Sequence, residues 1–402
     1  MKPTLCSAVF LLLATSAFTI PAQAEDVPPV VNAIFTSWES QLKTKPTYEK
    51  LEADGSGNIT ITNLVANTTA DGSKPGMKLT MGTLLLKGVA SEEGGLIEVG
   101  SATFSDTKVE IGSPDGKAFS VEIPGGSAEE WYVAVANDNP TPQQAFRASM
   151  SVAKKISSGE IKVTAMGQTI TSGGYEGTWD GDPATGAGKF TMAVKDVVIP
   201  EAALATMDPS GQMKQLGYGD LTITASGNGE LTVGEGIFGM SGDFTYAVKD
   251  MGGLKMAFAA SDVPTATYVE MQKAQKEGRT PDFNTLLPQL MKVSIGNLQL
   301  RFEDASITKK VLPLIAKMQG MDEAAVVANA GAMMQIGLMQ LKNQAFTDQV
   351  VGAVNAFLKD PKSFTLALKP AAPVKVQQLM TLDPANPGAA IDVLGVSVTA
   401  ND

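Results

Sequence analysis

The sequence predicts a β-rich protein of the α+β class, built on an extended, curved antiparallel sheet of hairpins with helices packed on one side. Residues 58–64 and 78–86 alternate polar and apolar side chains, which is typical of strands in a sheet with one solvated face. Glycine-rich turns separate such segments, as at residues 54–57, and glycine and aspartate tolerate the positive backbone angles of tight hairpins. The hydrophobic content of 44% is ordinary for a globular chain.

The chain divides into a predicted signal peptide at residues 1–24, an N-terminal β-rich region at 25–155, and a C-terminal region of repeated strands and helices at 156–402. The N-terminal region opens with a predicted helix over 30–42, because Val30, Ile34 and Trp38 fall on one helical face. Strand-like alternation follows as far as residue 111, and we expect a short helix over 140–153.

The C-terminal region contains an internal repeat. Residues 188–196 match residues 242–250 at seven of nine positions, and residues 363–369 are a third, weaker copy. Each copy reads as a strand, and the first and third lead into predicted helices that begin at a proline. The pattern indicates a strand–strand–helix unit used more than once. Ordinary strand composition is the alternative explanation.

The remaining predicted helices cover residues 200–207, 265–277, 306–358 and 373–382, and the segment 306–358 reads as two helices, over 306–318 and 322–358. Asp322 is a plausible N-cap within the longest of these segments. Alternating residues predict a strand over 293–303 and a final strand over 391–399.

The first 24 residues have the three parts of a secretory signal. Lys2 gives a positive start, residues 9–17 are apolar, and Ala22-Gln23-Ala24 forms a small-x-small cleavage site. We therefore expect export to a bacterial periplasm with removal of the signal.

Composition excludes several chemistries. The chain has no histidine, and its one cysteine, Cys6, lies in the predicted signal. Residues 25–402 therefore lack the groups for Ser-His-Asp or Cys-His catalysis and for zinc sites built on histidine or cysteine. We expect a protein that is not an enzyme and that carries no cofactor. The net charge of −11, without a dense basic cluster, argues against a nucleic-acid partner.

Two catalytic alternatives remain open on sequence grounds. Asp180 and Asp182 flank a glycine next to Trp179, and paired carboxylates hydrolyse glycosidic bonds. A Ser-Lys dyad needs no histidine, and Lys154 lies near Ser157. The acidic segment also fits a solvated turn, which we favour, and no Ser-x-x-Lys motif with supporting glycines is evident.

One turn resembles the start of an EF-hand calcium loop. Glu52, Asp54, Ser56 and Asn58 are the candidate metal ligands, and glycine follows at the sixth position. Position one is glutamate rather than aspartate, and position twelve is Asn63 instead of the bidentate glutamate. A glycine-rich hairpin turn is the favoured interpretation.

Methionines gather in the predicted helical segment 306–358. The candidate ligand-binding residues are Met318, Met321, Met333, Met334, Ile336 and Met339. A methionine-rich surface facing a concave sheet would hold an acyl chain or a partner helix, because methionine adapts to irregular apolar shapes. Simple packing of these helices onto the sheet is the alternative. Residues 324–341 carry no charge, but their polar and glycine residues lead us to expect no transmembrane span in the mature chain.

Residues 357–374, with the sequence FLKDPKSFTLALKPAAPV, resemble a segment of the YdgA-like and AsmA/TamB-like bacterial envelope proteins. In those families a helix ends, a strand follows and another helix begins. The resemblance implies a long, curved antiparallel sheet with helices on one side and a role in envelope lipid movement or outer-membrane assembly. No ligand residue carries over.

These observations favour an exported, non-catalytic periplasmic binding or envelope-maintenance protein, with a lipid or another apolar ligand. A structural or protein-interaction module of the cell envelope, without a small-molecule ligand, is the alternative.

Overall fold

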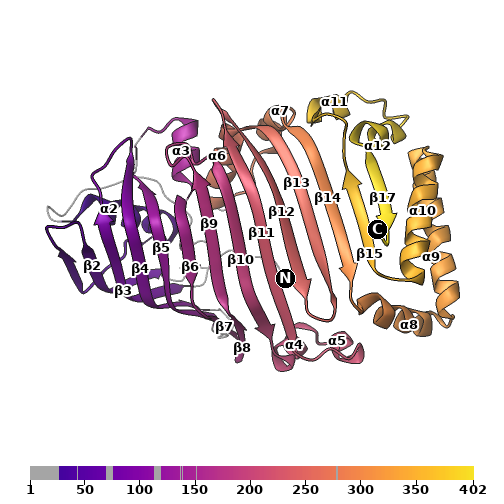
Figure 1. Ribbon diagram of the computed structural model, residues 1–402, viewed down its shortest axis with the longest axis horizontal. Coiled ribbons are helices and arrows are strands. Elements are labelled where there is room, and N and C mark those ends of the chain that lie inside the picture. Colours follow the sequence, from indigo (N-terminus) through magenta and orange to yellow (C-terminus); the bar gives the residue numbers. More distant parts are fainter. Residues whose placement is uncertain are drawn as a thin grey trace. The chain divides into compact units, whose positions relative to one another are not determined.

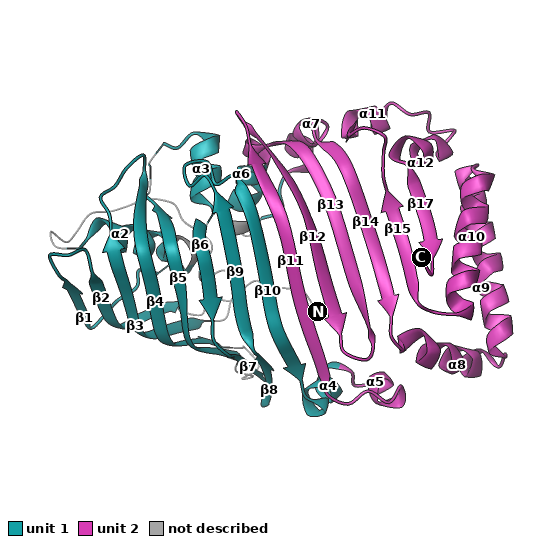
Figure 2. Ribbon diagram, in the orientation of Figure 1, with its two compact units in different colours: residues 1–207, 268–281 teal, residues 208–267, 282–402 magenta. Residues whose placement is uncertain are grey.

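The computed structural model describes residues 27–42, 44–68, 76–112, 119–135, 137, 139–150, 152–277 and 279–402, so the predicted signal lies outside the described residues. The chain forms two compact units (Figure 2). Unit 1 comprises Met1–Met207 and Tyr268–Pro281, and unit 2 comprises Asp208–Thr267 and Asp282–Asp402. Both are built mainly on antiparallel strands, which confirms the predicted β-rich α+β class (Figure 1).

The sheet of unit 1 begins as a simple meander of neighbouring antiparallel strands. These are β1 (Lys50–Ala53), β2 (Ile59–Thr68), β3 (Met77–Val89), β4 (Leu96–Ile111) and β5 (Phe119–Ala134). Buried side chains alternate with exposed ones along β2, as the sequence pattern predicts for a strand with one solvated face.

The sheet then continues through two strands that are each broken once. β6 (Val152–Ser158) and β7 (Ile161–Ala165) both pair with β5, whereas β8 (Gln168–Ser172) pairs with β7 and β9 (Gly174–Gly181) pairs with β6. β10 (Gly188–Ile199) pairs with β9 and β8. The domain boundary predicted near residue 155 falls inside β6.

Gly174 stands at the break between β8 and β9. Its φ angle is +111°, which favours glycine, and a Cβ atom there would lie 2.4 Å from the Ser158 carbonyl oxygen and 2.8 Å from that of Gly159. Only a residue without a side chain lets the two broken strands approach this closely.

The core of unit 1 lies between the sheet and α2 (Pro29–Leu42), the helix predicted over residues 30–42. Val30, Val31, Ile34 and Phe35 are at most 3% exposed and pack in one cluster with inward residues of β2–β5. Burial of such side chains contributes roughly 1.5–3 kcal/mol each. The same unit holds α3 (Pro142–Ala148), α4 (Glu201–Met207) and most of α6 (Thr265–Glu277).

Unit 2 is also built on antiparallel strands. Its neighbouring strands are β11 (Leu221–Val233), β12 (Ile237–Val248), β13 (Gly252–Pro264), β14 (Ser294–Asp304), β15 (Ser363–Leu368) and β17 (Val396–Ala400). The short β16 (Val374–Lys375) pairs with the start of β14.

The predicted helical segment 306–358, expected as helices over 306–318 and 322–358, contains three α-helices, because the second predicted helix is divided. They are α8 (Ile307–Gln319), α9 (Glu323–Leu338) and α10 (Gln344–Lys359), with the 3₁₀ turn η1 (Met339–Leu341) after α9. Gly320 ends α8 in the left-handed conformation, and the Asn343 side chain caps the start of α10. The smaller helices are α5 (Gln212–Gln215), α7 (Phe283–Leu290), α11 (Val376–Met380) and α12 (Gly388–Leu394).

Two C-terminal predictions need correction. The strand predicted over 391–399 begins only at Val396, because α12 occupies the first residues and Gly395, with a φ angle of +56°, ends that helix. The helix predicted over 373–382 begins at Val376, since Val374 and Lys375 pair with β14.

The first two repeat copies lie in β10 and β12, and both end at an aspartate with positive φ, Asp196 at 39° and Asp250 at 61°. Asp196 lies inside its strand, whereas Asp250 lies in the turn before β13. Duplication therefore stays a prediction.

We predict that Gly174→Ala destabilises unit 1 by about 3 kcal/mol, because the new methyl group meets two carbonyl oxygens in a backbone conformation unfavourable to alanine. Gly167→Ala is the matched control. Gly167 also has positive φ, +73°, but open space surrounds it, so the cost is about 1 kcal/mol. Urea denaturation of both variants measures the difference, and equal destabilisation would contradict the packing argument.

Candidate functional site

The predicted methionine-rich residues lie on and beside α9 in unit 2. The Asp322 side chain accepts a hydrogen bond from the Ala325 amide at 2.7 Å, which confirms the predicted cap. Val326 and Val327 are buried, and a Cβ atom at Gly331 would lie 2.9 Å from the Asn355 amide oxygen of α10. The small residue therefore lets α9 and α10 pack closely.

α10 covers the sheet at this end of unit 2. Its Val350 and Ala353 pack with Val398 of β17, and the Phe357 ring lies 5.7 Å from the Phe364 ring of β15, measured between centroids. α9 contacts α10 and α8 (Figure 1). The sheet surface is therefore already occupied where α9 would need to pack.

The candidate residues consequently face outward. We call them the Met-rich face; their exposed fractions are 78% for Met318, 36% for Met321, 74% for Met333, 44% for Met334, 69% for Ile336 and 67% for Met339. The prediction that these residues face a concave sheet is wrong, and so is the alternative that they pack the helices onto it. Both fail because α10 takes the inner position.

The apolar residues of α9 point to all sides of the helix instead of forming one stripe. Residues 332–337 are all exposed, although they span more than one helical turn. Glu323–Leu341 is long and apolar enough to cross a membrane, yet only 17% of its most apolar window is buried. A helix that is apolar all round normally lies in a protein core or in lipid.

We did not predict the exposure of α9, although the sequence contains a pattern that indicates it. Residues 324–341 carry no charge, and their apolar residues do not follow the helical period that indicates one buried face. Asp322 and Glu323 lie directly before the run, and Lys342 lies directly after it.

The candidate metal ligands belong to a hairpin turn between β1 and β2, as the favoured interpretation predicts. Asp54 Oδ1 accepts hydrogen bonds from the amides of Ser56 at 2.9 Å and Asn58 at 3.0 Å, and the Asn58 side chain donates to Asp54 Oδ2 at 2.8 Å. The Asn58 side chain is the main cause of the lowered pKa of Asp54. Glu52 is paired with Lys50 at 2.7 Å. Within the described ranges, no cluster of three or more acidic residues is arranged to hold a metal ion.

The acidic segment 179–182 lies where β9 ends. Asp182 accepts hydrogen bonds from the Thr185 hydroxyl at 2.8 Å and the Ala184 amide at 2.9 Å, and these bonds lower the pKa of Asp182. The favoured turn interpretation agrees with this geometry.

Contrary to the expectation from the sequence, a Ser-x-x-Lys sequence does begin α8, at Ser306 and Lys309. The Ser306 hydroxyl donates to the Asp250 carbonyl at 2.5 Å and lies 2.7 Å from the Tyr218 hydroxyl, and Lys310 instead of Lys309 lies over the Tyr218 ring. These contacts give the serine a structural role at the start of α8.

The C-terminal part of the chain matches a protein-family model. A family model described as "Uncharacterized protein" matches residues 245–401, a segment that begins in β12, ends after β17 and includes the whole Met-rich face. No curated protein matches the chain. The matched family carries no link to the YdgA-like or AsmA/TamB-like proteins, so that resemblance stays a prediction.

We predict that hydrogen peroxide oxidises Met318, Met333 and Met339 about tenfold faster than Met81, because methionine oxidation follows exposure and Met81 is only 7% exposed. Met380, 64% exposed on α11, is the control and reacts at a rate like that of Met333. Peptide mass spectrometry over time gives the rates. Slow oxidation of Met333 would show that the Met-rich face is covered in solution.

Proposed function

We propose that this protein is an exported, non-catalytic protein of the bacterial envelope that binds lipid by inserting the Met-rich face of α9 into a bilayer surface. The observation that carries the proposal is a helix with apolar residues on all sides and no charge after Glu323, whose most apolar 18-residue window is only 17% buried.

The shape of the apolar surface favours lipid over a partner helix. A partner helix would bury one stripe of α9, at positions three and four apart. Residues 332–337 are exposed on every side of the helix. The hydrocarbon of a bilayer can contact all of these sides at once. Methionine side chains adapt to the irregular packing of acyl chains.

The charge distribution supports apolar insertion as the driving force of the proposed binding. The chain carries a net charge of −11, so attraction to anionic head groups is weak overall. Lys342 directly follows the apolar run and has a side chain long enough to reach head groups, whereas the acidic residues Asp322 and Glu323 directly precede the run. We therefore expect binding to neutral vesicles that withstands salt.

The test is flotation of residues 25–402 with phosphatidylcholine vesicles. We predict that the protein floats with the vesicles at both 0.1 M and 1 M sodium chloride, because apolar insertion is not screened by salt. Ile336→Glu weakens the partition by at least about tenfold, since a charge in the hydrocarbon region costs about 2.5–3.5 kcal/mol.

Met380→Glu is the matched control, because Met380 is also exposed in unit 2 but lies on α11. This variant floats like the unmodified protein. Failure of the unmodified protein to float would overturn the proposal, and equal loss in both variants would place the lipid contact elsewhere. A concentration-dependent dimer that Ile336→Glu abolishes, without flotation, would assign the face to a second copy.

A further inference from the structure

One face of the strands in unit 2 is apolar from β11 to β17. The pairing register places Phe244 of β12 opposite Met256 of β13, and Met256 opposite Leu300 of β14, so these side chains form one row on the same face. The row continues to Leu366 of β15 and Val398 of β17.

The part of this face on β11–β14 is named here the apolar sheet face. It consists of every second residue, counted from the first, of the segments 225–231, 240–246, 254–258 and 298–302.

α10 covers the end of these rows that lies on β15 and β17. Its Val350 packs with Val398, and Leu366 packs against the same cluster. The Phe357 ring of α10 lies 6.0 Å from the Phe302 ring of β14, measured between centroids. α10 contacts β15 and β17 and lies away from β11 (Figure 1). The face that α10 buries at one end of unit 2 therefore continues past this helix toward β11.

Farther from α10, large side chains of the apolar sheet face are exposed. Their exposed fractions are 39% for Met240, 46% for Tyr246 and 41% for Leu254. Between them, the rings of Phe244 and Phe258 are stacked with an interplanar angle of 6° and centroids 5.9 Å apart. A Cβ atom at Gly227 would overlap the Phe244 ring, so this ring lies over β11. Exposed apolar surface of this kind marks a place where another molecule binds.

The apolar sheet face carries no charge and one hydroxyl group, that of Tyr246. The charged residues of the same four segments all lie on the opposite face of the strands; they are Glu230, Asp243, Lys255 and Arg301. The backbones of β12 and β13 pair with a strand on both sides. A molecule that covers this face therefore meets carbon and sulfur almost everywhere, and any charge it places there stays without a partner.

We propose that the apolar sheet face binds the two acyl chains of a zwitterionic phospholipid. A protein partner forms about one hydrogen bond per 100–200 Å² of interface, and the single hydroxyl of this face does not supply them. A second copy of the chain would bring together two molecules with a net charge of −11 each. Hydrocarbon needs neither hydrogen bonds nor charge. The inference concerns a surface separate from the Met-rich face and does not rest on insertion of α9.

The dimensions of the face suit two chains that lie side by side. Four neighbouring strands span roughly 14 Å, which is wider than one extended hydrocarbon chain. A seven-residue segment rises roughly 20 Å, and the acyl chains of one leaflet span about 15 Å. Because the face has no cation, a fatty-acid carboxylate or an anionic head group would find no partner there, whereas a zwitterionic head group balances its own charge.

Titration of dihexanoyl phosphatidylcholine into residues 25–402, below the micelle concentration of this lipid and followed by ligand-observed NMR, tests the site. We predict saturable binding. Glycerophosphocholine has the same head group without acyl chains and binds at least about tenfold more weakly, because the apolar contact is lost. No vesicles are present, so the result is independent of flotation by α9. No saturable lipid binding, or equal binding of glycerophosphocholine, would overturn the proposal.

Two substitutions on neighbouring strands localise the binding. Leu254→Glu places a carboxylate on the apolar sheet face at an exposed position and weakens lipid binding at least about tenfold. Thr245→Glu places the same charge on the opposite face, across from Lys255, and keeps the affinity within about threefold. Circular dichroism confirms that both variants fold. Equal affinity in the two variants would contradict the assignment. A dimer that Leu254→Glu dissociates, without lipid binding, would assign the face to a second copy and overturn the proposal.

Discussion

The packing of α10 between α9 and the sheet determines the exposed surface of unit 2. Val350 and Ala353 of α10 pack with Val398 of β17, and Leu338 at the end of α9 packs against this cluster, so α10 forms the inner layer at this end of the unit. α9 then packs on α10, where Gly331 lies against Asn355, and residues 332–337 of α9 are all exposed. Contact between apolar side chains and water is unfavourable in proportion to the exposed area. The helix therefore has a physical reason to associate with an apolar medium.

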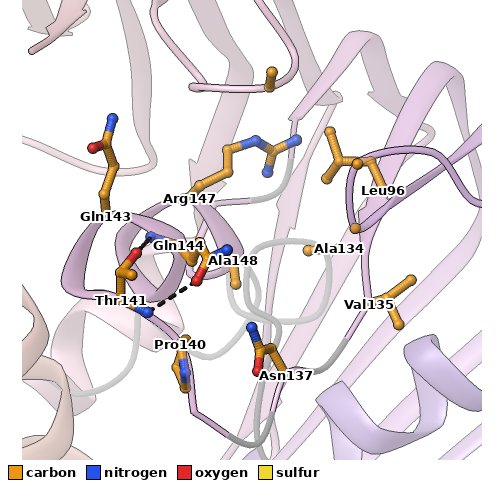
Figure 3. Close-up of a pocket in the computed structure, with 13 residues that line it drawn as sticks. Leu96, Ala134, Val135, Asn137, Pro140, Thr141, Gln143, Gln144, Arg147 and Ala148 are labelled. Atoms are coloured by element: carbon orange, nitrogen blue, oxygen red, sulfur yellow. Dashed lines mark hydrogen bonds between the residues drawn. The ribbon is translucent and has the colours of Figure 1, made fainter. Parts of the chain in front are cut away.

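In unit 1 the helix that packs on the sheet has its apolar side buried. The α2 residues Val31 and Phe35 insert into the face of β2–β5, and the apolar side of that helix is fully used. The unusual feature of this unit is a buried polar group: Arg147, which lines a cavity (Figure 3), has an Nη2 atom without a hydrogen-bond partner among the described residues. The two units thus present two different chemistries, an outward apolar helix in unit 2 and a recessed cation in unit 1.

The sequence predicted the fold class well because alternation, turn residues and caps are local signals. The strands of β2–β5, the helix at residues 30–42 and the Asp322 cap all follow from such patterns. The sequence predicted which residues form the Met-rich face, but not the direction in which their side chains point. Whether Met333 faces the sheet or the solvent depends on α10, which arrives from a later segment and takes the inner position. Arg147 gave no signal, because a lone arginine in a short helix becomes buried only through the loop around Pro183.

Depth measurement on a labelled α9 tests the central claim most directly. Residues 25–402 contain no cysteine, so Ile336→Cys gives one attachment point for a nitroxide spin label. With phosphatidylcholine vesicles present, we predict that the label becomes accessible to oxygen and inaccessible to a polar nickel complex, as expected for a position below the head groups. A label that remains equally accessible to the nickel complex with and without vesicles would contradict insertion of the Met-rich face.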